Sequence, residues 1–122
     1  MSAPRRRDRL SEFIRQEVAQ IILAELADPR LEKVAVTRAV VSDDVQQARV
    51  YVRVIGTEAD SRTALRALKG AAGKIRSEVG RRLQTRYTPQ LAFYLDEAVD
   101  QERRMHALLE QVEQELKGKP AD

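Results

Sequence analysis

Apolar residues recur at intervals of three and four along the first quarter of the chain, the spacing of one stripe of an amphipathic helix. The spacing predicts a helix from about Asp8 to Ala27. Its apolar positions are Leu10, Phe13, Ile14, Val18, Ile21, Ile22 and Leu26. Asp28-Pro29 ends the predicted helix, because proline disfavours the helical conformation of the residue before it.

A period of two follows and predicts a β-hairpin. The segment 34–41 is rich in β-branched residues, and Ser42-Asp43-Asp44 supplies turn chemistry. The next segment alternates Ala48, Val50, Val52 and Val54 with Arg49, Tyr51, Arg53 and Ile55. Because the connection is short, we expect the two strands to be antiparallel. Arg49 and Arg53 then share the face opposite the valines.

The helical spacing returns after Gly56-Thr57 but is interrupted. Its apolar positions are Leu65, Leu68, Ala72, Ile75, Val79 and Leu83. Gly70 and Gly73 fall within this stripe, and each costs roughly 1 kcal/mol relative to alanine in a helix. We therefore predict a helix, a kink and a second helix rather than one straight helix.

The last part of the chain predicts a third strand and a further helix. Thr88-Pro89 breaks the helical pattern, and Leu91, Phe93 and Leu95 alternate with more polar positions. An amphipathic helix is expected from about Asp100, with apolar positions Met105, Leu108, Leu109, Val112 and Leu116. This order predicts an α+β domain, in which helices pack on one face of a three-stranded sheet. The domain spans residues 10–116, between a flexible basic arm (1–9) and a frayed tail (117–122).

The composition excludes several protein classes. The chain has no cysteine, which rules out disulfides and thiolate metal sites and suits a reducing cytoplasm. No apolar run approaches the roughly 18 residues that a membrane span needs. The basic N-terminus is not followed by an apolar signal-peptide core. We expect a cytoplasmic protein.

Positive charge is concentrated in the interrupted helix. Residues 66–86 hold seven bases and one acid, Glu78, whereas residues 96–122 hold eight acids and four bases. Helix charges often form only a solvated face, but one acid cannot pair seven bases within the helix, which favours binding of a polyanion. The candidate RNA-binding residues are Arg5, Arg6, Arg7, Arg9, Arg49, Arg53, Lys69, Lys74, Arg76, Arg81, Arg82 and Arg86.

The kink itself reads Gly70-Ala71-Ala72-Gly73, a literal match to the GxxG loop of KH domains. In that loop the nucleic-acid backbone approaches closely because glycine has no side chain. A second interpretation is equally open, namely a packing kink where two helices cross closely.

Catalytic chemistry has little support. His106 lies beside an apolar stripe with no evident partner, and Asp43-Asp44 and Asp96-Glu97 are pairs at strand ends that usually cap backbone groups. Tyr51, Tyr87 and Tyr94 are candidates for stacking on bases, with none preferred. We expect no enzyme, no cofactor, no metal ion and no small-molecule substrate, and recognition that depends on RNA shape and phosphate.

The ordered motifs resemble the bacterial ribosome-binding factor A family from about Leu10 to Leu109. The residues that carry the resemblance are Asp28-Pro29-Arg30, Val41-Ser42-Asp43-Asp44, Ala48-Arg49-Val50-Tyr51-Val52, Ala71-Ala72-Gly73 with Ile75-Arg76, Gly80-Arg81-Arg82-Leu83 with Arg86, Pro89-Gln90-Leu91 with Phe93, and Asp96-Glu97. Each motif is weak alone, whereas the set in this order is specific.

The resemblance implies a type II KH-like fold, in which an Ala-x-Gly kink at Ala71 and Gly73 replaces GxxG. It also implies binding to the free small (30S) ribosomal subunit, help with late maturation and processing of 16S rRNA, and a role in cold adaptation. We expect a monomer. The alternative is a protein-interaction module that docks a partner through its acidic C-terminal helix.

Overall fold

A computed structural model describes residues 3–84 and 87–118, and its elements follow the predicted order. They are α1 (Ala3–Ala24), a short 3-10 helix η1 (Pro29–Leu31), β1 (Val34–Val41), β2 (Gln47–Val54), α2 (Glu58–Leu83), β3 (Gln90–Leu95) and α3 (Glu97–Gly118). This is an α+β fold of the KH-like type, as predicted.

The three strands form one sheet in the order β1-β2-β3. β1 and β2 are antiparallel, which confirms the predicted hairpin, and β3 runs parallel to β2. Alternation along β2 buries Ala48, Val50 and Val52 completely. These side chains share one face of the sheet because successive strand residues point to opposite sides.

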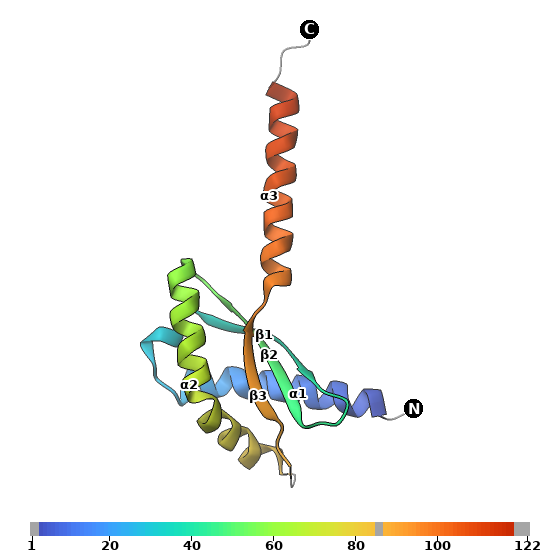
Figure 1. Ribbon diagram of the computed structural model, residues 1–122, viewed down its shortest axis with the longest axis vertical. Helices are drawn as coiled ribbons and strands as arrows, with labels where there is room; N and C mark the ends of the chain where they lie inside the picture. Colours follow the sequence, from blue (N-terminus) through green and yellow to red (C-terminus); the bar gives the residue numbers. More distant parts are fainter. Residues whose placement is uncertain (1–2, 85–86, 119–122) are drawn as a thin grey trace.

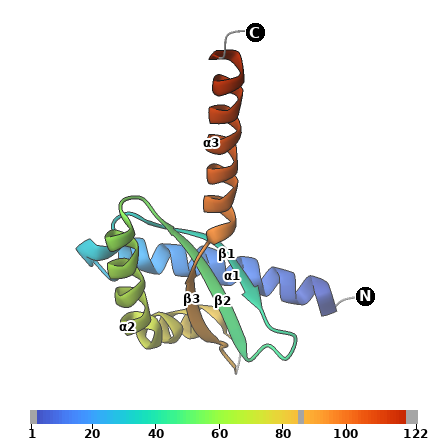
Figure 2. The ribbon, with the colours of Figure 1, turned by 45° about the horizontal axis from the view of Figure 1, so that its top comes forward.

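α1 and α2 cover that face of the sheet (Figure 1), with α1 against β1 and α2 against β3. The predicted apolar stripes supply the core: Ile14, Val18, Ile21, Leu68, Ile75 and Val79 are fully buried. The opposite face, which we call the open face, carries no helix in either ribbon view (Figure 2).

α1 begins earlier than predicted. Seven of the nine residues assigned to a flexible arm lie in its first turns, because the helix starts at Ala3. Proline at the second helical residue, Pro4, is compatible with this start, since its missing N–H would have no partner in the first turn. Arginine also favours helix, so the run Arg5-Arg6-Arg7 extends it.

β1 contains an irregularity that the sequence pattern did not reveal. The pairing register with β2 shifts between Val36 and Arg38. Val34 and Val36 face the core side before the shift, whereas Ala39 and Val41 do so after it. The extra residue, Thr37, thus moves Arg38 onto the open face, as β-bulges do when they redirect side chains.

α2 is one continuous helix of 26 residues that changes direction near its middle (Figure 2). The predicted kink is therefore a bend within a helix rather than a break. Thr57 caps the helix: its side chain accepts the Asp60 N–H, and the Asp60 side chain accepts the Thr57 N–H. This capping box satisfies two otherwise unpaired donors.

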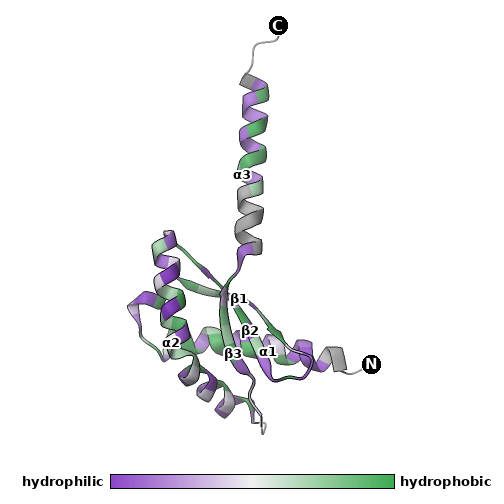
Figure 3. Ribbon diagram, viewed as in Figure 1, coloured by the Kyte–Doolittle hydropathy of each residue, from purple (hydrophilic) through white to green (hydrophobic). Residues whose placement is uncertain are grey.

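α3 does not pack on the sheet, contrary to the expectation that all helices share one face. It extends away from the sheet (Figure 1), and apolar residues run along it (Figure 3). Its apolar side chains are exposed by 42–68%: Met105, Leu108, Leu109, Val112 and Leu116. The stripe predicted a helix correctly, but helical periodicity does not say which surface will cover the stripe.

A matched pair of leucines distinguishes the body of the domain from α3. We expect Leu68→Ala to lower the free energy of unfolding by about 2–5 kcal/mol, because Leu68 is fully buried and its removal leaves a cavity. Leu109→Ala should change it by less than about 0.5 kcal/mol, because Leu109 is 54% exposed. Urea denaturation followed by circular dichroism measures both, and equal destabilisation would contradict the described packing.

Candidate RNA interface

The exposed side of α2 around its bend carries cations that have no partner. Arg62, Arg66, Lys69 and Gly73 follow one another at helical spacing and are exposed, so they share one side of the helix. Lys74 is exposed beside them. None of these four basic side chains makes an ion pair or hydrogen bond with another described residue. We call this set, with Gly70, the bend surface.

The glycines of the bend surface face open space. A Cβ atom added to Gly70 or Gly73 would meet no atom within 4 Å, apart from the nearby backbone of the helix itself. A packing kink between closely crossing helices would instead place a neighbour against the glycine. The structure therefore argues against that interpretation and leaves a smooth, cationic surface open to a partner's backbone.

A groove joins the bend to the sheet. Its volume is about 280 Å³, and it lies between α2 and β3. The residues that line it are Lys69, Ala72, Leu91, Ala92, Phe93 and Tyr94. One wall is therefore cationic and the other is apolar or aromatic, a combination that suits phosphate on one side and a base on the other.

Two of the predicted RNA-binding arginines are held inside the domain. Arg82 bridges two acids: it donates to Glu17 of α1 at 2.7 Å and also to Glu25, just after the end of that helix. The hydrogen bond to Glu17 is the largest influence on the guanidinium, and the pKa of Arg82 is raised above its ordinary value. Arg82 thus fastens α2 to α1, and its charge is already matched.

Arg76 is also engaged within the fold. Its guanidinium donates to the carbonyl oxygens of Thr88 at 2.7 Å and Pro89 at 3.2 Å, where the chain enters β3. Arg81 pairs with Glu78 one turn away but stays largely exposed. Glu78 alone cannot pair the seven bases of residues 66–86, but Arg82 pairs with acids outside that segment, Glu17 and Glu25, which the count of charges along the segment did not include.

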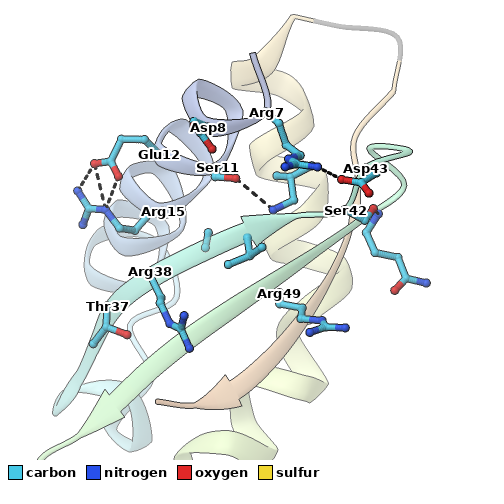
Figure 4. A pocket seen from close by; sticks show the side chains of 14 residues that line it. Arg7, Asp8, Ser11, Glu12, Arg15, Thr37, Arg38, Ser42, Asp43 and Arg49 are labelled. Carbon is cyan, nitrogen blue, oxygen red and sulfur yellow. Dashed lines mark hydrogen bonds and ion pairs between the residues drawn. The ribbon is translucent and has the colours of Figure 1, made fainter. Parts of the chain in front are cut away.

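Arg7 lines a second, larger groove of about 730 Å³ between α1 and β1 (Figure 4). Its charges are largely matched within the fold: Arg7 pairs with Asp43, and Arg15 pairs with Glu12. Arg6 and Arg9 are exposed, while the side chain of Arg5 and the whole of Arg86 lie outside the described residues. This mixed-charge groove suits a polyanion less well than the bend surface does.

Arg49 and Arg53 lie on the open face, as the alternation predicted. Their side chains make no ion pair or hydrogen bond with a described residue. Arg49 of β2 and Arg38 of β1 both line the larger groove (Figure 4). Four of the predicted cations therefore lie on two surfaces that meet at the edge of β3: Lys69 and Lys74 on the bend surface, and Arg49 and Arg53 on the open face.

The side chains considered for catalysis either form hydrogen bonds or an ion pair within the fold or are exposed without a partner among the described residues. Asp44 accepts hydrogen bonds from Ser42 and the Gln46 N–H, which lowers the pKa of its carboxyl group. Asp96 is buried and accepts from Thr37 at 2.5 Å, and His106 is exposed on α3. Within the described ranges, no cluster of His, Cys, Asp or Glu could hold a metal ion, and no helix could cross a membrane.

Sequence reasoning left Arg62 and Arg66 out of the site. Their spacing from Lys69 and Gly73, at four, three and four residues, was the available signal. Arg38 was also left out, because only the bulge in β1 turns it to the open face.

Comparison with known proteins decides the family. The ribosome-binding factor A family model matches residues 6–109. The chain belongs to the ribosome-binding factor A family. The family member from Thermomicrobium roseum is 44% identical over 110 residues, 90% of this chain and 85% of that protein. The member from Acetivibrio thermocellus is 42% identical over 112 residues, 91% of each chain.

Solved structures of the ribosome-binding factor A family share this fold. The crystal structure of the Thermus thermophilus protein matches with a TM-score of 0.66 and 31% identity, over 73% of this chain and 94% of that one. A homology model of the Thermus thermophilus protein, fitted into an electron cryomicroscopy map of its 30S complex, matches with a TM-score of 0.63 and 32% identity, over 75% of this chain and 96% of that one.

The adjacent arginines Arg81 and Arg82 should behave differently. We expect Arg82→Gln to lower the melting temperature, because it leaves both Glu17 and Glu25 without their cation. Arg81→Gln should leave it nearly unchanged, since exposed ion pairs within one helix contribute little. Thermal denaturation measures both, and equal melting temperatures would show that the Arg82 bridge does not hold α1 and α2 together.

Proposed function

We propose that this chain binds the small ribosomal subunit by placing its bend surface against the phosphate backbone of 16S rRNA. The observation that carries the proposal is the set of unpaired cations around two exposed glycines. These cations make no hydrogen bond or ion pair in the described part of the chain that would stabilise the fold. The Thermus thermophilus relative fitted into a 30S complex supports the choice of partner.

In this proposal the phosphate contacts come from four side chains: Arg62, Arg66, Lys69 and Lys74. Their charges are unmatched, so binding releases the counterions of the RNA without breaking internal ion pairs. Gly70 and Gly73, which are exposed and have no side chain, keep the helix surface low enough for close approach, whereas Ala71 of the predicted kink packs against the core. Arg76 and Arg82 act as positioning residues, since they hold the second half of α2 in place.

Binding itself is the proposed activity, without catalysis, cofactor or metal ion. A ligand shifts an RNA toward the conformation that it binds better, so the protein would hold one late folding state of 16S rRNA. We propose that this assists late maturation and processing of the RNA in the cytoplasm, supports growth in the cold, and requires only a monomer.

Charge reversal at the bend tests the interface. We expect the double variant Lys69→Glu, Lys74→Glu to lower affinity for purified 30S subunits at least tenfold, because two attractive phosphate interactions become repulsive. The slope of log affinity against log salt should also fall, by about 0.7–0.9 for each phosphate that the variant no longer neutralises. Co-sedimentation with 30S subunits at several salt concentrations measures both quantities.

The matched control is the double variant Lys33→Glu, Lys117→Glu. It changes the net charge equally but at exposed lysines outside the bend surface. We expect its affinity to stay within a factor of about three of the unchanged protein. An equal fall in affinity in both variants would show that net charge, rather than the bend surface, determines binding to the 30S subunit.

A second candidate function rests on α3. Its exposed apolar stripe is flanked by Glu110, Glu113 and Glu115, which favours binding to a basic protein. If that interaction drives association, 30S binding would survive charge reversal at the bend and would disappear in Leu108→Ala, Leu109→Ala.

A further inference from the structure

The open face carries one row of side chains that runs across all three strands. The register pairs Arg38 of β1 with Tyr51 of β2, and Tyr51 with Tyr94 of β3. The Arg38 guanidinium carbon lies 4.0 Å from the centroid of the Tyr51 ring. The Tyr51 and Tyr94 rings are 5.8 Å apart and tilted by 33°.

From this row we infer that the open face is a second RNA site, one that stacks an unpaired nucleobase of single-stranded RNA on Tyr94. This inference rests on the proposed RNA-binding function and extends it to a different surface. In this inference the helix bend contacts phosphate, and the open face of the sheet stacks the base.

Tyr94 has the exposure that stacking requires. It is 46% exposed, and its neighbour two residues back on the same face is the small Ala92. One face of the Tyr51 ring is already covered by Arg38. The next π-surface in the row, at Tyr94, is therefore the one available to a base, and base–aromatic stacking needs no particular base identity.

The charges on the open face fit a nucleic-acid strand. Arg49 and Arg53 lie two residues on either side of Tyr51, so they flank the row along β2. Together with Arg38 they give this face three cations. Asp96, at the end of β3, is the acid beside them, and its side chain is only 4% exposed. Phosphates on either side of a stacked base would meet positive charge.

Asp96 shows that the row is held in place at some cost. Its Oδ2 accepts from the Thr37 hydroxyl at 2.5 Å and lies 3.6 Å from Arg38 Nε. Its Oδ1 is buried with no partner among the described residues. Leaving a buried carboxylate oxygen unpaired is unfavourable, and such groups are rare without a role. Here the carboxylate positions Arg38 over Tyr51.

The two surfaces connect at β3. Tyr94 belongs to the open face and also lines the groove that contains Lys69. An RNA strand bound at the bend surface can therefore pass the edge of β3 and reach Tyr94 without leaving the protein. This path explains why the unpaired cations lie on both sides of the sheet.

A cross-strand aromatic pair also stabilises a sheet, so the test needs a readout that a structural role would not move. The chain has no tryptophan, so its emission comes from tyrosine. We would titrate the full chain with a ten-nucleotide oligoadenylate and with an abasic ribose-phosphate strand of the same length. We expect oligoadenylate to quench tyrosine emission and to bind about 5- to 100-fold more tightly than the abasic strand.

Variants locate the effect. Tyr94→Val should reduce affinity for oligoadenylate to that for the abasic strand, and Tyr94→Phe should retain most of the affinity because phenylalanine keeps the stacking ring. Tyr87→Val is the matched control, an exposed tyrosine outside the strands, and should bind oligoadenylate as the unchanged protein does.

Equal affinity of the unchanged protein for the two strands, with unchanged tyrosine emission, would overturn the inference and needs no variant. Binding to 30S subunits, measured in parallel, separates the two proposals. Retained, salt-dependent subunit binding with no preference for bases would refute only the open-face site. If the protein binds 30S subunits no more tightly than it binds the short strands, the proposed function itself is refuted.

Discussion

The position of the second half of α2 depends on the bridge that Arg82 makes to Glu17 and Glu25 of the α1 region. This bridge, with the bonds from Arg76 to the backbone at residues 88 and 89, fixes the direction that α2 takes after its bend. The bend in turn decides which cations face outward. Arg82 and Arg76 are thus positioning groups, and the lysines at the bend are left free for a partner.

Local features of the chain were predictable because their causes are local. The stripe that buries Ile14 and Val18, and the alternation that buries Val50 and Val52, follow directly from residue spacing. The roles of the arginines were not predictable in this way. Arg82 lies 65 residues from Glu17, and no helical or strand period connects them. A basic residue on an exposed helical position therefore predicted a cation but not its partner.

The bulge at Thr37 and the course of α3 show the same limit. A strict period of two along β1 would have turned Arg38 toward the core side, and one extra residue reverses that assignment. In α3 the apolar stripe predicted the helix, yet the stripe stays exposed. In each case the sequence pattern describes one helix or strand, whereas the position of its side chains depends on how that element packs against or pairs with another.

In our proposal the bend of α2 is shaped for an external backbone rather than for the fold, and Gly73→Ala separates these two roles. Gly73 has no positive φ and no neighbour against it, so alanine should raise the stability of the helix by up to about 1 kcal/mol. We expect this stabilised variant to bind 30S subunits more weakly than the unchanged protein, because the added methyl group stands on the bend surface. Unchanged affinity in a stabilised Gly73→Ala protein would contradict this expectation.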